Sequence, residues 1–222
     1  MDAAFKRNVK YVTMFQLKFF GMILAFGVLY GIFFGFMSDE GGKSAIRSAV
    51  GYLEMLLIIM PMSLQMRYVK WTGSFICSMG GTRKNVIWGQ HIMTAELIAE
   101  AIILVAIVRS IFHMPWNNGF YGFYYYMMSY IIMMAVGIFG ALLMDKWNTW
   151  GLVMCIVLGI TFAMGYVFSA GGFGNGQLLL VNGVSVMENP ICLLVMTLIA
   201  LIVYAVAGLF AAKKFRRMEV TI

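Results

Sequence analysis

Six apolar stretches, each about as long as a membrane-spanning helix, occupy most of the chain. They run over about residues 15–37, 46–66, 91–112, 120–144, 149–169 and 191–212. A helix needs about 20 apolar residues to cross a hydrocarbon core of about 30 Å. Of the 222 residues, 62% are hydrophobic and only 11% are charged, whereas soluble domains are about a quarter charged. We therefore expect an all-α, polytopic membrane protein in which residues 1–222 form a single transmembrane domain of six helices.

The positive charges predict the orientation of these helices. If the first helix starts in the cytoplasm, only Lys43, Arg47 and Arg109 of the 16 Lys and Arg residues fall outside. Because positive residues next to helix ends resist translocation, both termini are predicted to be cytoplasmic. Orientation and attraction to anionic lipid in the bilayer then account for the net charge of +7, with no nucleic-acid partner.

Two further segments carry local signals. Residues 1–14 place Lys6, Arg7 and Lys10 among apolar side chains at roughly helical spacing, which predicts an interfacial helix on the inner leaflet. The segment from Ala170 to Pro190 is rich in Gly and Asn and predicts a small outer hairpin, either re-entrant or on the surface.

Residues that carry out catalysis or bind metals are scarce. The two histidines, His91 and His113, are separated by a whole predicted span, so they cannot pair at a metal site. No Ser/His/Asp set and no paired acids in an aqueous cleft are recognisable. We expect no enzyme activity, no metal site and no cofactor held by this chain.

The connector between the second and third spans is the most informative segment. Residues 66–90 are more than a turn between neighbouring helices needs. Residues 71–79 are predicted to form a short helix, residues 80–81 a sharp turn, and residue 82 the cap of the next helix. The residues concerned are Trp71, Phe75, Ile76, Met79, Gly80, Gly81 and Thr82, followed by Arg83 and Lys84 at the membrane border. Such a helix either docks in a groove of a partner protein or lies in lipid, and the physical pattern leaves both open.

A family resemblance rests on the turn at the end of this connector. The turn reads Ser78-Met79-Gly80-Gly81-Thr82-Arg83-Lys84 and is followed by apolar Val86 and Ile87. Together with six spans and a basic amphipathic start, it resembles the permease subunits of bacterial ABC-2-type exporters. The resemblance implies that residues 71–84 hold a cytoplasmic coupling helix that docks on a separate ATPase, which binds ATP and Mg. It also implies a bacterial plasma membrane location and a second permease chain, identical or different, that completes a dimer.

Small residues recur at four-residue spacing on two spans: Gly27, Gly31 and Gly35 on the first, and Gly151, Cys155, Gly159 and Ala163 on the fifth. Such ridges let helix backbones approach closely in lipid. Spacing alone allows packing within one subunit or at a dimer seam. In the resembled family the first and fifth spans meet across the dimer, which favours the seam.

Three acids lie inside apolar spans: Glu54 in the second, and Glu96 and Glu100 in the third. A carboxylate in hydrocarbon costs several kcal/mol unless it faces protein or water, so each is a candidate for function. Because Glu96 and Glu100 are four residues apart, they share a helix face. They predict a polar strip in a substrate path, or acids satisfied by groups on neighbouring helices.

These patterns lead to one preferred function and two rivals. The preferred function is a permease subunit that exports an amphipathic or hydrophobic substrate, a peptide first among the possibilities, using ATP hydrolysed by the separate subunit. The first rival is an ATP-independent secondary transporter or channel with the three acids as a proton or cation relay. The second is a membrane immunity or scaffold protein without transport.

Overall fold

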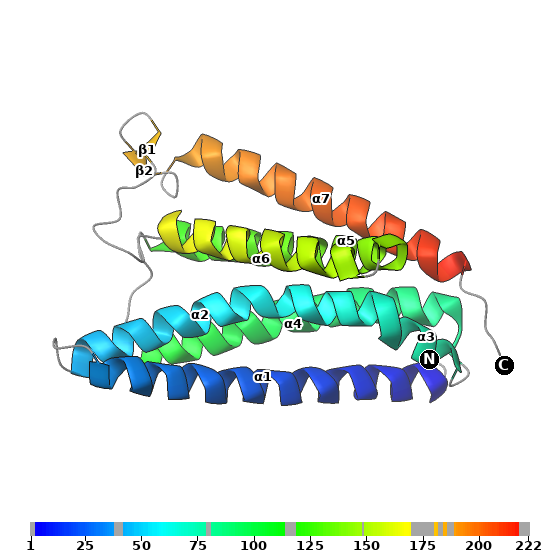
Figure 1. Ribbon diagram of the computed structural model, residues 1–222, viewed down its shortest axis with the longest axis horizontal. Coiled ribbons are helices and arrows are strands. Elements are labelled where there is room, and N and C mark those ends of the chain that lie inside the picture. Colours follow the sequence, from blue (N-terminus) through cyan, green and yellow to red (C-terminus); the bar gives the residue numbers. More distant parts are fainter. Residues whose placement is uncertain are drawn as a thin grey trace.

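The computed structural model describes residues 3–37, 42–78, 81–113, 119–147, 149–169, 180–181, 184–185 and 189–217. Over these residues the protein is almost entirely helical (Figure 1). The long helices are α1 (Ala3–Met37), α2 (Gly42–Arg67), α4 (Arg83–Ile111), α5 (Phe120–Trp147), α6 (Thr149–Ser169) and α7 (Pro190–Arg217). Between α2 and α4 lie the π-helix η1 (Tyr68–Thr72) and the short helix α3 (Gly73–Ser78).

The long helices alternate in direction along one axis, so the start of α1 and the end of α7 lie at the same end of the bundle (Figure 1). We call this the basic end, because the helix termini gathered there carry most of the positive residues. These are Lys6, Arg7, Lys10, Arg67, Lys70, Arg83, Lys84, Lys146, Lys213, Lys214, Arg216 and Arg217. The predicted up-and-down order is therefore present in the fold.

The core is formed mainly by α2 and α5. Helix α5 packs against α2, α6 and α7, while α1 packs against α2 and α4. Large side chains from the middle of α5, among them Tyr130, Met133 and Ile138, are fully buried. Leu57 and Ile58 of α2 are buried with them in the same apolar cluster. Burial in this fold is thus concentrated around one central helix pair.

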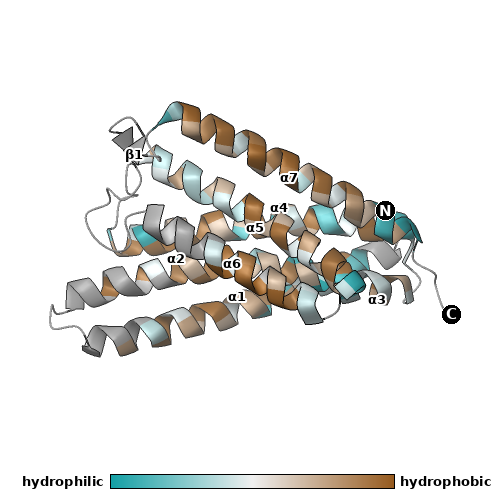
Figure 2. Ribbon diagram, turned by 45° about the horizontal axis from the view of Figure 1, so that its top comes forward, coloured by the Kyte–Doolittle hydropathy of each residue, from teal (hydrophilic) through white to brown (hydrophobic). Residues whose placement is uncertain are grey.

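Away from the basic end, the outer helices expose many large apolar side chains. The ribbon of α7 is hydrophobic along most of its length (Figure 2). Within the described residues, four helices are long and apolar enough to cross a membrane: Lys6–Tyr30 of α1, α4, α5 and α7. Helix α2 contains Pro61 and the polar residues Glu54 and Gln65, and the apolar stretch Thr149–Thr161 of α6 is by itself shorter than a span. The sequence and the fold together therefore describe a helical protein of membrane type, and crossing by all six helices stays a prediction.

The expected boundary after residue 14 is wrong. Helix α1 continues without interruption from Ala3 to Met37, because no Pro or Gly lies between residues 3 and 20 to end it. The four-residue series Asn8, Val12, Gln16 and Phe20 is buried along one face. The first turns therefore pack against the bundle as part of the first long helix, while the other face of α1 stays exposed.

A hairpin between Ala170 and Pro190 is present where the structure describes this segment, and its position outside the membrane stays a prediction. Strand β1 (Leu180–Val181) pairs antiparallel with β2 (Val184–Ser185), with Leu180 opposite Ser185. Helix α7 begins directly afterwards at Pro190, and Asn189 caps it by accepting hydrogen bonds from Ile191 N and Cys192 N. The hairpin lies at the end of the bundle opposite the basic end (Figure 1).

Candidate functional site

The predicted coupling segment continues directly from α2. Arg67 and Gly73, which flank η1, both have right-handed helical backbone angles, so α2, η1 and α3 form one continuous helical path from Gly42 to Ser78. The short helix predicted over residues 71–79 is present as α3, but it begins at Gly73 and is not separate: α2 continues into it through η1, where only the hydrogen-bond spacing widens. A displacement of α3 would therefore act directly on α2.

The faces of this segment are only partly as predicted. Trp71 and Phe75, one helical turn apart, are 53% and 45% exposed. Ile76, expected beside them, is buried at 1% exposure together with Cys77. Met79 and Gly80 lie outside the described residues. The outward surface, which we call the aromatic face, therefore consists of Trp71 and Phe75.

The turn after α3 is confirmed where it is described. Gly81 N donates a hydrogen bond to Ile76 O at 2.9 Å, and a Cβ at Gly81 would come within 2.7 Å of that same oxygen, so only glycine fits. Thr82 caps α4, as expected, by accepting a hydrogen bond from Asn85 N. The exposed side chains of Arg83 and Lys84 follow at the basic end.

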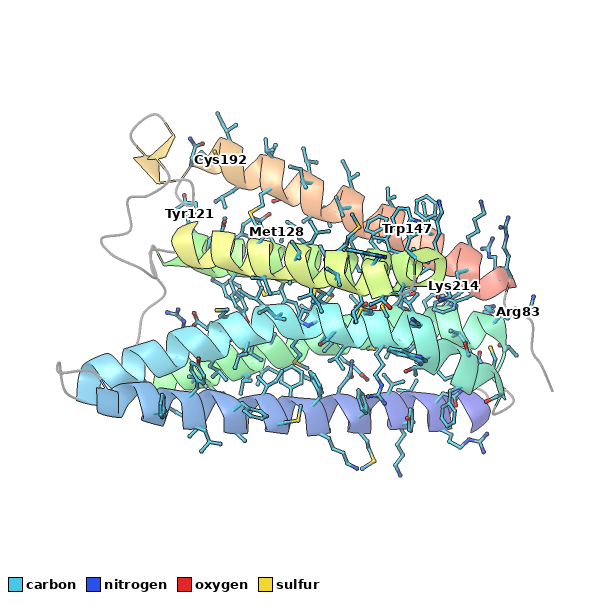
Figure 3. All side chains as sticks on the ribbon, viewed as in Figure 1. Arg83, Tyr121, Met128, Trp147, Cys192 and Lys214 are labelled. Atoms are coloured by element: carbon cyan, nitrogen blue, oxygen red, sulfur yellow. The ribbon has the colours of Figure 1, made fainter. Side chains whose placement is uncertain are left out.

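Residues from α4 and α7 hold the segment in place. The Tyr68 hydroxyl donates a hydrogen bond to Val86 O at 2.8 Å, and the Tyr68 ring meets Phe215 of α7 edge-on. Burial raises the pKa of Tyr68 above its usual range, which keeps the hydroxyl a neutral donor. Arg83 donates a hydrogen bond to Arg216 O at 2.7 Å and so also joins α4 to α7 (Figure 3). The aromatic face thus lies on a segment tied to three long helices.

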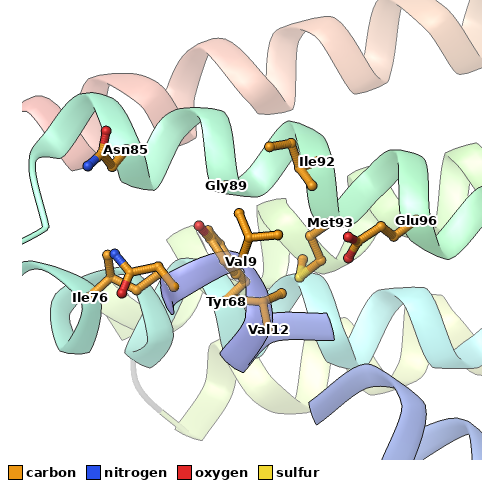
Figure 4. A pocket seen from close by; sticks show the side chains of 10 residues that line it. Val9, Val12, Tyr68, Ile76, Asn85, Gly89, Ile92, Met93 and Glu96 are labelled. Carbon is orange, nitrogen blue, oxygen red and sulfur yellow. The ribbon is translucent and has the colours of Figure 1, made fainter. Parts of the chain in front are cut away.

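A small cavity with mostly apolar walls and three polar side chains lies behind this segment, between α1, η1, α3 and α4 (Figure 4). Its volume is about 10 Å³, on the order of the space that one water molecule needs. Asn8, Asn85 and Glu96 line it with Gly89 and apolar neighbours. The Asn8 amide group, 4% exposed as a residue, has no hydrogen-bond partner among the described residues. Asn8 is the first polar residue in the buried series of α1, a position that only the packing reveals.

Glu54 is paired. Its carboxylate accepts two hydrogen bonds from Arg109 of α4, from Nε at 2.6 Å and from Nη2 at 2.9 Å. The two side chains are 9% and 14% exposed. This matches the alternative in which the acid is satisfied by a neighbouring helix, here by a residue expected to lie outside the membrane. We therefore leave Glu54 out of the proposed substrate path.

Glu96 and Glu100 differ in their surroundings. Both carboxylate oxygens of Glu96 lie 3.0 Å from the Thr13 hydroxyl of α1. The Oε2 atom of Glu100 is buried and has no hydrogen-bond partner within the described part of the chain. An acid whose oxygen is left without a donor in a bundle interior is costly to retain, which makes Glu100 the stronger functional candidate of the pair.

The small residues assigned to a dimer seam have neighbours within the chain wherever their surroundings are described. Gly27 faces Leu53 of α2, Gly151 lies against the backbone of Leu143 in α5, and Gly159 faces the Met62 sulfur. Packing within one subunit thus accounts for these three. The structure does not describe the side-chain surroundings of Gly31, Gly35 and Ala163. The dimer seam therefore stays a prediction.

A buried polar cluster joins three helices and was missed from the sequence. The Thr94 hydroxyl of α4 accepts hydrogen bonds from Gln65 Nε2 of α2 at 2.8 Å and from the Tyr204 hydroxyl of α7 at 2.9 Å. Thr94 also donates to Gln90 O. Uncharged polar residues inside apolar spans often hydrogen-bond between helices, so Gln65, Thr94 and Tyr204 could have indicated this cluster from the sequence.

The chain matches no model of a known protein family, no curated protein and no solved structure.

Proposed function

We propose that this protein is the membrane-spanning subunit of an ATP-driven exporter and that its ATPase, a separate polypeptide, docks on the aromatic face. In this proposal all six long helices cross a bacterial plasma membrane, with the basic end in the cytoplasm. A second permease chain completes the transporter. The substrate is amphipathic or hydrophobic, with peptides the first class to test.

The observation that carries the proposal is the combination of exposure and rigid attachment at Trp71 and Phe75. Two aromatic side chains at helical spacing on a basic surface suit a groove on a partner protein, because large aromatic anchors supply much of the binding energy at such contacts. Their backbone is continuous with α2, and Tyr68 contacts both α4 and α7. A partner that pushes on this face would therefore shift three helices together, which is what coupling to a motor requires.

Replacing both Trp71 and Phe75 by Ala should abolish capture of the ATPase. Loss of aromatic anchors at an interface typically weakens binding by at least about 2 kcal/mol, or roughly thirty-fold. The measurement is affinity purification of the tagged chain from its native membranes in mild detergent, followed by mass spectrometry and an ATP hydrolysis assay of the eluate. Trp150→Ala is the matched control, because Trp150 is 74% exposed near the same end of the bundle.

The same purification tests separately how the charges of Arg83 and Lys84 contribute to ATPase binding. Lys84→Glu reverses an exposed charge that has no described role in packing, whereas Arg83→Glu also removes the hydrogen bond to Arg216 O. If the unaltered chain brings down no nucleotide-hydrolysing polypeptide, or if the double alanine variant retains it fully, the exporter proposal fails.

Glu100→Gln should reduce substrate export, and substrate-stimulated ATP hydrolysis with it, while assembly with the ATPase remains intact. The substitution keeps the shape of the side chain and removes its capacity for negative charge. Asp145→Asn is the control, since Asp145 is a half-exposed acid paired with Lys214 at the basic end. Transport at the original rate would remove Glu100 from the substrate path. Transport that persists in ATP-depleted vesicles and collapses with the proton gradient would favour the secondary transporter instead.

A further inference from the structure

The exposed face of the first turns of α1 forms a groove that the proposed function does not use. The groove has a volume of about 330 Å³ and lies on the outer surface of the bundle. Its lining residues are Arg7, Lys10, Tyr11, Met14, Phe15 and Lys18. Positions 7, 10/11, 14/15 and 18 recur every three or four residues, so they lie along a single broad face of the helix. This is the face opposite the buried series of α1.

The charge of the groove is of one sign. Three of its six lining side chains are cationic, and none is acidic. A fourth cation lies beside it, because the Arg67 guanidinium of α2 is 3.9 Å from the centre of the Phe15 ring. Three long basic side chains around a hollow of this size are complementary to a phosphate group.

The surroundings of the groove indicate which phosphate compound fits. Beside Lys18 and beyond it, the same helix exposes Leu17, Met22 and Phe26 at 56%, 46% and 59%. A basic groove therefore leads along the helix axis into an apolar exposed surface, within a stretch apolar enough to cross a membrane. A phospholipid has this sequence of properties from headgroup to acyl chain, whereas an acidic peptide has no need of the apolar continuation.

We infer that this groove is a binding site for an anionic phospholipid, with the headgroup phosphate between Lys10 and Lys18 and the acyl chains along Leu17 and Met22. The site does not depend on the exporter proposal. It lies next to the aromatic face, since the Tyr11 and Phe75 rings are 5.5 Å apart. Lipid in the groove would therefore border the surface on which we expect the partner to dock.

The test is lipid capture by the full chain in nanodiscs, with phosphatidylcholine as the background lipid and phosphatidylglycerol as the probe. Retained lipid is counted by native mass spectrometry after release into detergent. The variant Lys10→Gln/Lys18→Gln should bind phosphatidylglycerol roughly thirty-fold more weakly, because each basic residue near a lipid surface contributes about 1 kcal/mol. Lys213→Gln/Arg217→Gln is the matched control, since it removes two exposed charges from the same end of the bundle.

The outcomes separate the possible ligands. Selective retention of phosphatidylglycerol by the unaltered chain and by the control, with its loss in the groove variant, supports the site. Equal retention by all three chains overturns it. Competition by millimolar inorganic phosphate would reveal a site for free anions, and competition by a hexaglutamate peptide would reveal a protein-binding surface; either result overturns the lipid assignment. If the double variant is not recovered as a folded chain, Lys18→Gln alone serves, with an expected loss of roughly five-fold.

Discussion

Arg109→Met should destabilise the bundle by about 3–5 kcal/mol, the usual cost of removing one partner from a buried ion pair. The reason lies in Glu54, whose carboxylate would lose both of its hydrogen bonds from Arg109 while remaining inside the packed helices. Burying an unpaired carboxylate is far more costly than burying the pair. For a domain of this size the apparent melting temperature in detergent should fall by about 10 °C. Size-exclusion chromatography after heating provides the measurement.

Three further variants test whether the pair itself is responsible. Glu54→Met combined with Arg109→Met should recover most of the loss, because no charge is left buried and both replacement side chains are apolar. Glu54→Arg combined with Arg109→Glu should recover part of it by restoring the attraction in reverse. Asp145→Asn, which breaks the more exposed pair with Lys214, should cost no more than about 1 kcal/mol. A double methionine variant as unstable as Arg109→Met would contradict this explanation.

Local sequence signals were sufficient to place the long helices. Each of the six predicted stretches overlaps one long helix, although α1 and α4 begin well before the predicted residues 15 and 91. Runs of about 20 apolar residues are long enough to indicate a helix even where its ends are uncertain. The cap at Thr82 and the turn at Gly81 were equally readable, since both depend on residues within a few positions of one another. Features that depend on residues close together in the sequence were therefore predicted correctly.

The sequence did not predict which face of a short helix is buried or which residues of different helices pair. Ile76 was expected on the outward surface beside Phe75, yet a six-residue helix such as α3 is too short for its periodicity to show which side packs against α1 and α4. The pairing of Glu54 with Arg109 joins residues 55 positions apart on different helices. Contacts of this kind depend on the tertiary arrangement, and a single sequence contains no direct record of them.

The same limit applies to the small residues. Four-residue spacing on the first span singles out Gly27, Gly31 and Gly35, but the α2 backbone at Met62 comes close to α5 at Gly137, which belongs to neither of the two small-residue series. Gly137 stands in the buried middle of α5, where every neighbouring residue is also small or apolar. Nothing in its local sequence distinguishes it from a glycine that simply faces lipid.

Gly137→Ala should therefore be among the most damaging small substitutions in the chain. A Cβ at Gly137 would lie 2.8 Å from both Cα and the carbonyl carbon of Met62, and closer still to the carbonyl oxygen. These are backbone atoms of α2, one residue after Pro61, and they cannot rotate away as the end of a side chain can. The two central helices would have to separate, and overpacking of this kind costs about 3 kcal/mol in a well-packed interior.

Two other glycines provide the controls for this prediction in the same heating assay. Gly159→Ala meets the Met62 sulfur and terminal methyl and, at ordinary contact distance, the Met133 methyl; all are ends of flexible side chains, so its cost should stay below about 1 kcal/mol. Gly208→Ala has open space around the added methyl group and should be neutral or stabilising by up to about 1 kcal/mol, since alanine favours a helix over glycine. If Gly137→Ala melted at the same temperature as Gly208→Ala, α2 and α5 would not be in close backbone contact, and the central pair on which this fold depends would be arranged differently.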